Sequence, residues 1–117
     1  MKLIHKLEPL WWILFGAGGF TVCFFLPALL LGVLIMAPLG WLPHGMVYWR
    51  AHELAAHPLG RIFLVSVISL ALWHCAHHLR HFTLDIFGHG AAAAGAYVSY
   101  GLALFGSLVA LALVSAL

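Results

Sequence analysis

Charge is confined to three short windows of this chain, and its placement decides what kind of protein the chain can form. All eight Lys, Arg, Asp and Glu residues lie within residues 2–8, 50–61 and 80–85. The segments between and after these windows are almost wholly apolar. A water-soluble fold would have to cover its surface with Leu, Val, Phe and Ala, so the solvent of this chain must be lipid.

Three apolar segments are long enough to cross a membrane. A helix needs roughly 20 residues to cross a hydrocarbon core of about 30 Å, and segments 10–39, 61–84 and 91–116 meet that requirement. No water inside the bilayer can bond to exposed peptide groups, so each span must be a helix. We predict an all-α membrane protein in which residues 1–117 form one domain with three transmembrane helices.

The loop after the first span has signals of its own. The first helix is broken by prolines and glycines, namely Pro38, Gly40, Pro43 and Gly45. Residues 46–57 can then form a short helix at the membrane interface, where Tyr48 and Trp49 fit the aromatic belt. Pro58 and Gly60 are expected to close this loop before the second span begins.

Small residues and one proline predict how the spans pack. In the first span, Gly16, Gly18 and Gly19 allow another helix to come close, whereas Pro27 removes a backbone hydrogen bond and predicts a kink. In the last span, every fourth residue is small, which places a stripe on one helical face: Ala91, Gly95, Ser99, Ala103 and Ser107. We expect this stripe to pack against protein.

The basic residues predict the orientation. Lys2, Lys6 and Arg80 lie on one side of a three-span chain, and Arg50 and Arg61 lie on the other. Because cytoplasmic loops carry an excess of Lys and Arg, the N-terminus is predicted to be cytoplasmic. The first apolar run is too long for a cleaved signal peptide, so it should be retained as an anchor. The formal charge of +2 gives no basis for nucleic-acid binding.

Four of the nine histidines lie in the last turns of the second span, and the others lie near helix ends or in loops. Those four are His74, His77, His78 and His81. Ionisable groups at such depth mark functional sites by default. On a helix, His74, His77 and His81 share one face and His78 lies on its flank. Cys23 and Cys75 lie on different spans and are interpreted as small apolar residues.

Depth brings two tryptophans to the same place. The first span starts and the second span ends at the same membrane surface, so Trp11 and Trp12 lie near the depth of His77 and His81. An indole facing an imidazole at the edge of the hydrocarbon suits a flat ring with polar oxygens and a lipid-soluble tail, which describes a quinone. The alternative is that the tryptophans are belt residues and the histidines only reach towards the interface.

Other chemistries of the histidine cluster stay open at this point. His74, His77 and His78 spell the H-x-x-H-H box of membrane di-iron enzymes, but those sites need several such boxes. A zinc or copper site could use His77, His81 and Asp85, although two histidines four residues apart are a weak signal. A b-type haem needs a second axial ligand, which a partner chain would have to supply because the first and third spans have no mid-membrane histidine.

The chain resembles the D subunit of bacterial fumarate reductase over nearly its full length. The most specific match is the opening block, Glu8, Pro9, Trp11, Trp12 and the run L-F-G-A-G-G at 14–19. Further matches are Pro27, P-L-G at 38–40, Gly60, Arg61, Leu72, Trp73, His77, His81, Asp85 and Y-G-L-A at 100–103.

This resemblance implies a four-subunit quinol:fumarate reductase in the bacterial inner membrane. Its partners are a second membrane anchor (the C subunit), an iron–sulfur subunit and a flavoprotein subunit, and the last two hold the iron–sulfur clusters and FAD. The anchors are expected to bind menaquinol and no haem. Within this chain the resemblance assigns the quinol to Trp12 and His77. Trp11, His78, Arg80 and His81 are weaker candidates from their depth in the spans.

One departure from the family concerns the basic group of the site. The family has arginine directly after the site histidine, where this chain has His78. The arginine of this chain lies two positions later, at Arg80. Two positions turn a residue by about 200° around a helix, so Arg80 cannot make the same contact. The alternatives to the quinol anchor are a structural anchor or assembly factor, and a haem-bearing anchor of a succinate dehydrogenase-like complex.

Overall fold

Three long helices follow one another along the chain, and a short helix lies between the first two. The computed structural model describes residues 6–43 and 48–117. Three of its helical stretches, Glu8–Met36, Pro58–Phe87 and His89–Ser115, are long and apolar enough to cross a membrane. The elements are α2 (Glu8–Leu30), the π-helix η1 (Leu31–Met36), α3 (Tyr48–Ala56), α4 (Pro58–Phe87), the 3-10 turn η3 (His89–Ala91) and α5 (Ala92–Ser115). The predicted fold class, including the short interfacial helix, is confirmed.

The first span begins earlier and ends earlier than its predicted bounds of 10–39. It begins at Glu8 because Pro9 lies in the first turn, where its missing N–H breaks no helical hydrogen bond. The negative charge of Glu8 also interacts favourably with the positive N-terminal end of the helix dipole. The α-helix continues through Pro27. At Leu31, whose N–H bonds to the carbonyls of Pro27 and Ala28, the backbone changes to the π-helix. The kink predicted at Pro27 stays a prediction.

The second span also begins before its predicted first residue, 61. His57 caps α4, because its Nδ1 accepts the Leu59 N–H at 3.2 Å, and Pro58 occupies the first turn. The prediction that Pro58 and Gly60 close the loop is therefore wrong, since both residues belong to α4. The helix ends after Phe87 at Gly88, whose φ of 71° favours glycine.

The short helix α3 packs against the start of α4. A Cβ at Gly60 would clash with the backbone carbonyl of Leu54 and would lie 3.2 Å from the Cα of Ala55. Glycine at this position lets the two backbones touch. The described helix begins at Tyr48, and the start of the predicted segment 46–57 lies outside the described residues.

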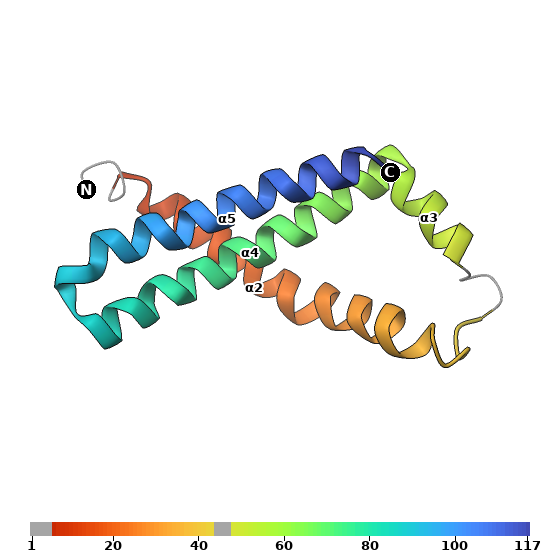
Figure 1. Cartoon of the computed structure of the whole chain (residues 1–117), viewed down its shortest axis with the longest axis horizontal. Helices are drawn as coiled ribbons and strands as arrows, with labels where there is room; N and C mark the ends of the chain where they lie inside the picture. Colours follow the sequence, from red (N-terminus) through yellow and green to blue (C-terminus); the bar gives the residue numbers. More distant parts are fainter. Residues whose placement is uncertain (1–5, 44–47) are drawn as a thin grey trace.

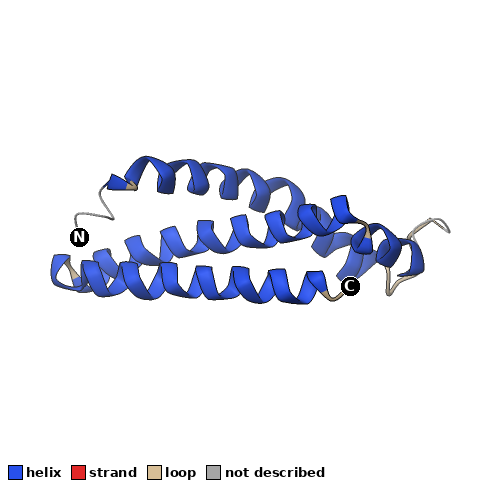
Figure 2. Ribbon diagram, turned by 90° about the horizontal axis from the view of Figure 1, so that it is seen from above, coloured by secondary structure: helices blue, strands red, loops and turns tan. Residues whose placement is uncertain are grey.

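Helix α4 is central and contacts both of the other long helices (Figures 1 and 2). Against α2, a Cβ at Gly18 would lie 2.7 Å from the Cβ of His74 and would clash with the Leu70 carbonyl. Against α5, a Cβ at Gly95 would lie 2.8 Å from the Cγ2 of Thr83. The predicted small-residue stripe packs against protein as expected, since Gly95, Ser99 and Ala103 are all buried on α5.

Side-chain size is inverted relative to a water-soluble bundle. The buried apolar side chains are small, namely Val67, Ala76, Ala96, Ala103, Ala110 and Val114, whereas many Leu, Phe and Trp side chains are exposed. Small side chains let helices approach closely, and large ones favour contact with lipid or another subunit. The turn between α4 and α5 lies at the same end of the molecule as the start of α2, while α3 lies at the other end (Figure 1).

Candidate functional site

His77 is where the three long helices meet. Its side chain is only 6% exposed. From α2, the rings of Trp12 and Phe15 lie 5.6 and 4.6 Å from its imidazole, measured between centroids. From α5, the Tyr100 hydroxyl lies 3.1 Å from its Nδ1. The predicted meeting of Trp12 and His77 at a common depth is therefore present in the fold.

Both ring nitrogens of His77 have partners within the chain. Nδ1 bonds to the Tyr100 hydroxyl, and Nε2 lies 3.2 Å from Nε2 of His81 one turn later on α4. Two nitrogens at this distance can bond only if one carries a proton and the other does not. The His77–His81 pair thus shares one proton between its two Nε2 atoms.

Arg80 and Tyr100 favour one position for that proton. Arg80 Nη1 donates to the Tyr100 hydroxyl oxygen over a long distance of 3.5 Å, and a guanidinium can only donate. The hydroxyl keeps its own hydrogen for another partner, and we infer that it donates this hydrogen to His77 Nδ1. In that arrangement a neutral His77 carries its proton on Nε2 and donates it to His81 Nε2.

The two tryptophans occupy different environments. Trp12 is 58% exposed, so one side of its indole contacts Phe15 and His77 and the rest is open to a ligand, lipid or partner. Trp11 instead stacks on Tyr100, with 4.7 Å between ring centroids, and on Trp73 at 5.3 Å. Its Nε1 is buried without a hydrogen-bond partner in the described part of the chain. Trp11 therefore packs against the Tyr100 ring and helps to hold it in place.

His74 ties α4 to α2. Its Nδ1–H donates to the backbone carbonyl of Phe15 at 3.0 Å, and its ring stacks on the Phe15 ring with 4.6 Å between centroids. Gly18 and Gly19 make room for it, since Cβ atoms there would lie 2.7 and 3.1 Å from His74 atoms. Contact with His74 therefore explains Phe15, Gly18 and Gly19 of the L-F-G-A-G-G run in packing terms and gives His74 a structural role.

His78 and Arg80 lie towards different helices. The exposed His78 contacts the Phe15 ring of α2 at 5.3 Å between centroids. The partly buried Arg80 reaches the Tyr100 hydroxyl of α5. Arg80 and His78 therefore contact different helices, and their roles at a quinol stay predictions. The Nε of Arg80 is buried without a bonding partner among the described residues.

Sequence reasoning gave no site role to Phe15 or Tyr100, although both touch His77. A usable signal was present for Tyr100, which is a phenol in a helix otherwise rich in Ala, Leu, Val and Gly. Phe15 gave no such signal among the many aromatic residues of its span. In the described residues, no three His, Cys, Asp or Glu side chains are placed to hold a metal ion together.

Two hollows of the described chain lie away from Trp12 and His77. One, of about 310 Å³, lies between α4 and α5 and is lined by Leu79, Thr83, Ala91, Ala94, Gly95, Val98 and Ser99. Another, of about 290 Å³, lies at the opposite end, beside Arg61. At Trp12 and His77, the exposed part of the indole leaves a surface that another molecule can contact.

Comparison with known proteins connects these observations. The family model for the D subunit of fumarate reductase matches residues 3–115. The chain is 35% identical over 97 residues to the fumarate reductase D subunit of Vibrio cholerae, covering 82% of this chain and 74% of that protein. It is 37% identical over 83 residues to the protein of the same name from Aliivibrio fischeri, covering 70% and 69% of the two chains. With its three membrane-spanning helices, this chain belongs to the family of fumarate reductase D subunits.

Proposed function

We propose that this membrane protein anchors a quinol:fumarate reductase and supplies one wall of its menaquinol-oxidising site. The observation that carries the proposal is the contact between Trp12 at the start of α2 and His77 near the end of α4, with 5.6 Å between ring centroids. An exposed indole beside a histidine pair, near one end of the spans, suits a ligand with a flat polar ring and a lipid-soluble tail.

The His77–His81 pair matches the chemistry of a quinol hydroxyl. Such a hydroxyl has one hydrogen to donate and lone pairs that accept. The pair offers the converse, an N–H on His77 and an unprotonated Nε2 on His81, 3.2 Å apart. His81 is exposed, so its ring can turn and let the hydroxyl enter between the two nitrogens. His77 would then donate to the quinol oxygen while His81 accepts the proton that leaves it.

The aromatic residues would hold the ring in place. Trp12 and Phe15 form an apolar edge beside His77, and Trp12 has most of its surface free to contact the quinol. Oxidation of menaquinol to menaquinone releases two protons and two electrons. We assign the electrons to an iron–sulfur cluster of the iron–sulfur protein, with FAD and fumarate in the flavoprotein. The remaining wall of the pocket is assigned to the second membrane anchor and the iron–sulfur protein.

The proposed orientation places this site at the cytoplasmic face of the bacterial inner membrane. Lys6 precedes α2 and Arg80 lies near the end of α4, so both lie towards the same end of the molecule. The excess of basic residues on the cytoplasmic side supports a cytoplasmic N-terminus. A reporter fused after Leu117 should be active only outside the cytoplasm, and activity inside would reverse the orientation.

Substitution of His77 tests the proposal. The variant His77→Gln should leave the complex assembled and able to reduce fumarate with a soluble artificial donor, while menaquinol oxidation falls. The matched control is His89→Gln, which changes an exposed histidine in the turn η3. If His77→Gln retains full menaquinol oxidation, the assignment of His77 is wrong.

A purely structural anchor is the competing function, and one observation favours it. Both ring nitrogens of His77 bond within the chain, as they would in a histidine that only holds helices together. Trp12 separates the two functions, because replacing a residue that only contacts lipid should leave quinol affinity unchanged. A haem-bearing anchor is tested by the reduced-minus-oxidised absorption spectrum of the purified complex, in which a b-type haem gives a sharp band.

A further inference from the structure

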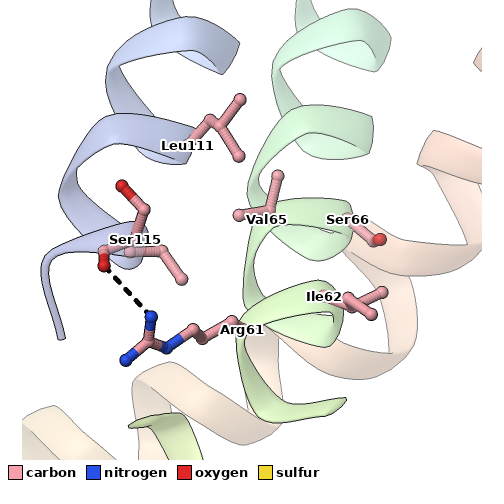
Figure 3. A pocket seen from close by; sticks show the side chains of 7 residues that line it. Arg61, Ile62, Val65, Ser66, Leu111 and Ser115 are labelled. Carbon is pink, nitrogen blue, oxygen red and sulfur yellow. Dashed lines mark hydrogen bonds between the residues drawn. The ribbon is translucent and has the colours of Figure 1, made fainter. Parts of the chain in front are cut away.

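A groove lies at the other end of the molecule from His77, between the start of α4 and the end of α5. Its volume is about 290 Å³. Aliphatic side chains from both helices form its walls, and Arg61 and Ser115 lie at its outer end (Figure 3). Ile62 and Leu111 are both exposed, so the groove is open on the side that faces lipid or a partner subunit.

Arg61 brings a positive charge to this groove. Its Nε donates to the carbonyl of Ala56 at 2.9 Å, and its Nη1 donates to the carbonyl of Ser115 at 3.1 Å. Both acceptors are carbonyls at the C-terminal ends of α3 and α5, and they fix the guanidinium between the two helices. Helix dipoles compensate only part of the charge, and among the described residues no carboxylate pairs with Arg61, so positive charge is left to attract an anion.

Charge and apolar walls together define the ligand. We propose that the groove binds an anionic phospholipid, with the phosphate on the Arg61 guanidinium and one acyl chain along Val65 and Leu111. Arg61 lies in the first turn of a membrane-spanning helix, which is the depth of lipid head groups. The groove extends from there along the hydrocarbon-facing part of α4, which is the direction an acyl chain takes.

The size of the groove fits one chain. Pockets that enclose drug-sized molecules have volumes of about 300–1,000 Å³, and this groove lies just below that range. It can therefore hold part of an acyl chain. In the described part of the chain, the hydrogen bonds of Arg61 use Nε and Nη1, so Nη2 and the open outer end leave room for a phosphate outside the apolar part.

Native mass spectrometry of the purified complex tests the proposal. The complex is exchanged into detergent with phosphatidylglycerol or with phosphatidylcholine of the same acyl chains, and retained lipid is counted. Wild type should retain phosphatidylglycerol in preference. In Arg61→Gln this retention should fall about tenfold or more, as expected for the loss of a direct hydrogen bond to a charged group. Arg50→Gln is the matched control, because Arg50 is an exposed arginine on the neighbouring α3.

A second variant covers the case in which Arg61→Gln fails to assemble. Leu111→Trp keeps Arg61 and fills the groove from α5, so retention of phosphatidylglycerol should fall there too. Three results would overturn the proposal: unchanged phosphatidylglycerol in Leu111→Trp, equal retention of both lipids by wild type, or an equal loss in Arg61→Gln and Arg50→Gln. Recovery of quinone in place of phospholipid from this groove would also overturn it.

Discussion

Replacing Tyr100 by Phe removes one hydroxyl and tests how the proton on His77 is placed. That hydroxyl lies 3.1 Å from His77 Nδ1 and 3.5 Å from Arg80 Nη1. The remaining ring can keep its stacking on Trp11 and Trp73, whose centroids lie 4.7 and 5.8 Å away. Packing should therefore survive, and the variant should lose only the bond that holds the proton of His77 on Nε2.

The size of the effect follows from one hydrogen bond. A bond of this kind contributes about 0.5–1.5 kcal/mol, which corresponds to a factor of about 2–12 between the two neutral tautomers of His77. If only the tautomer with a proton on Nε2 binds the quinol oxygen, menaquinol oxidation should show kcat/KM reduced by up to about tenfold. Fumarate reduction with a soluble donor should be unchanged, because that reaction bypasses the quinol.

A matched substitution lies one turn away. Tyr97 is on the same helix α5 and is 63% exposed, so Tyr97→Phe removes an equivalent hydroxyl away from His77. The pH profile of menaquinol oxidation should change in Tyr100→Phe and not in Tyr97→Phe. Equal kinetics for wild type and Tyr100→Phe over the whole pH range would refute the argument that Arg80 and Tyr100 place the proton.

Two further predictions concern α2. Trp12→Ala should raise the KM for menaquinol about fivefold to tenfold, as expected for the loss of an aromatic contact of about 1–1.5 kcal/mol. Trp12→Phe should restore most of the affinity for menaquinol, whereas unchanged kinetics of Trp12→Ala would favour the purely structural anchor. Gly18→Ala should lower the melting temperature of the complex, because its Cβ would lie 2.7 Å from the Cβ of His74, and overpacking costs about 1–3 kcal/mol. Gly16→Ala is its control, since a Cβ there meets no atom of the described chain within 4 Å, and equal melting temperatures for the two variants would contradict the packing argument.

The architecture could be predicted from the sequence because membrane insertion leaves few choices. Long apolar runs must be helices, and the small-residue stripe of α5 identified its packed face correctly. The start of the second span was misplaced because Pro58 was interpreted as a loop residue, whereas His57 caps the helix and Pro58 occupies its first turn. In a membrane protein the residues around a proline at a helix start and around a proline in a loop are similar, so they do not distinguish the two positions.

The site was predictable only in part, for a geometric reason. The depth of a residue follows from its position along a span, and depth alone placed Trp12 near His77. Rotation about the helix axis depends on packing, which the sequence does not state. The inward direction of Trp11 and the contact of Tyr100 with His77 are both matters of rotation. His74 was grouped with His77 because its rotation about the helix axis could not be predicted. In the fold, Gly18 and Gly19 leave room for the His74 ring, and its Nδ1 bonds to the carbonyl of Phe15.

The fold divides the histidine site into a fixed part and an adaptable part. His77 is buried between three helices, and Tyr100 stacks on the partly buried Trp11, so these groups have little freedom to move. His81 and Trp12 are exposed and adjoin the fixed part through His77. A site that binds and releases a lipid-soluble quinol needs this division, because the fixed groups set the proton geometry and the exposed groups can turn to admit the ring. A change that prevents the His81 ring from turning away from His77 should therefore slow menaquinol oxidation, even though every residue of the site is still present.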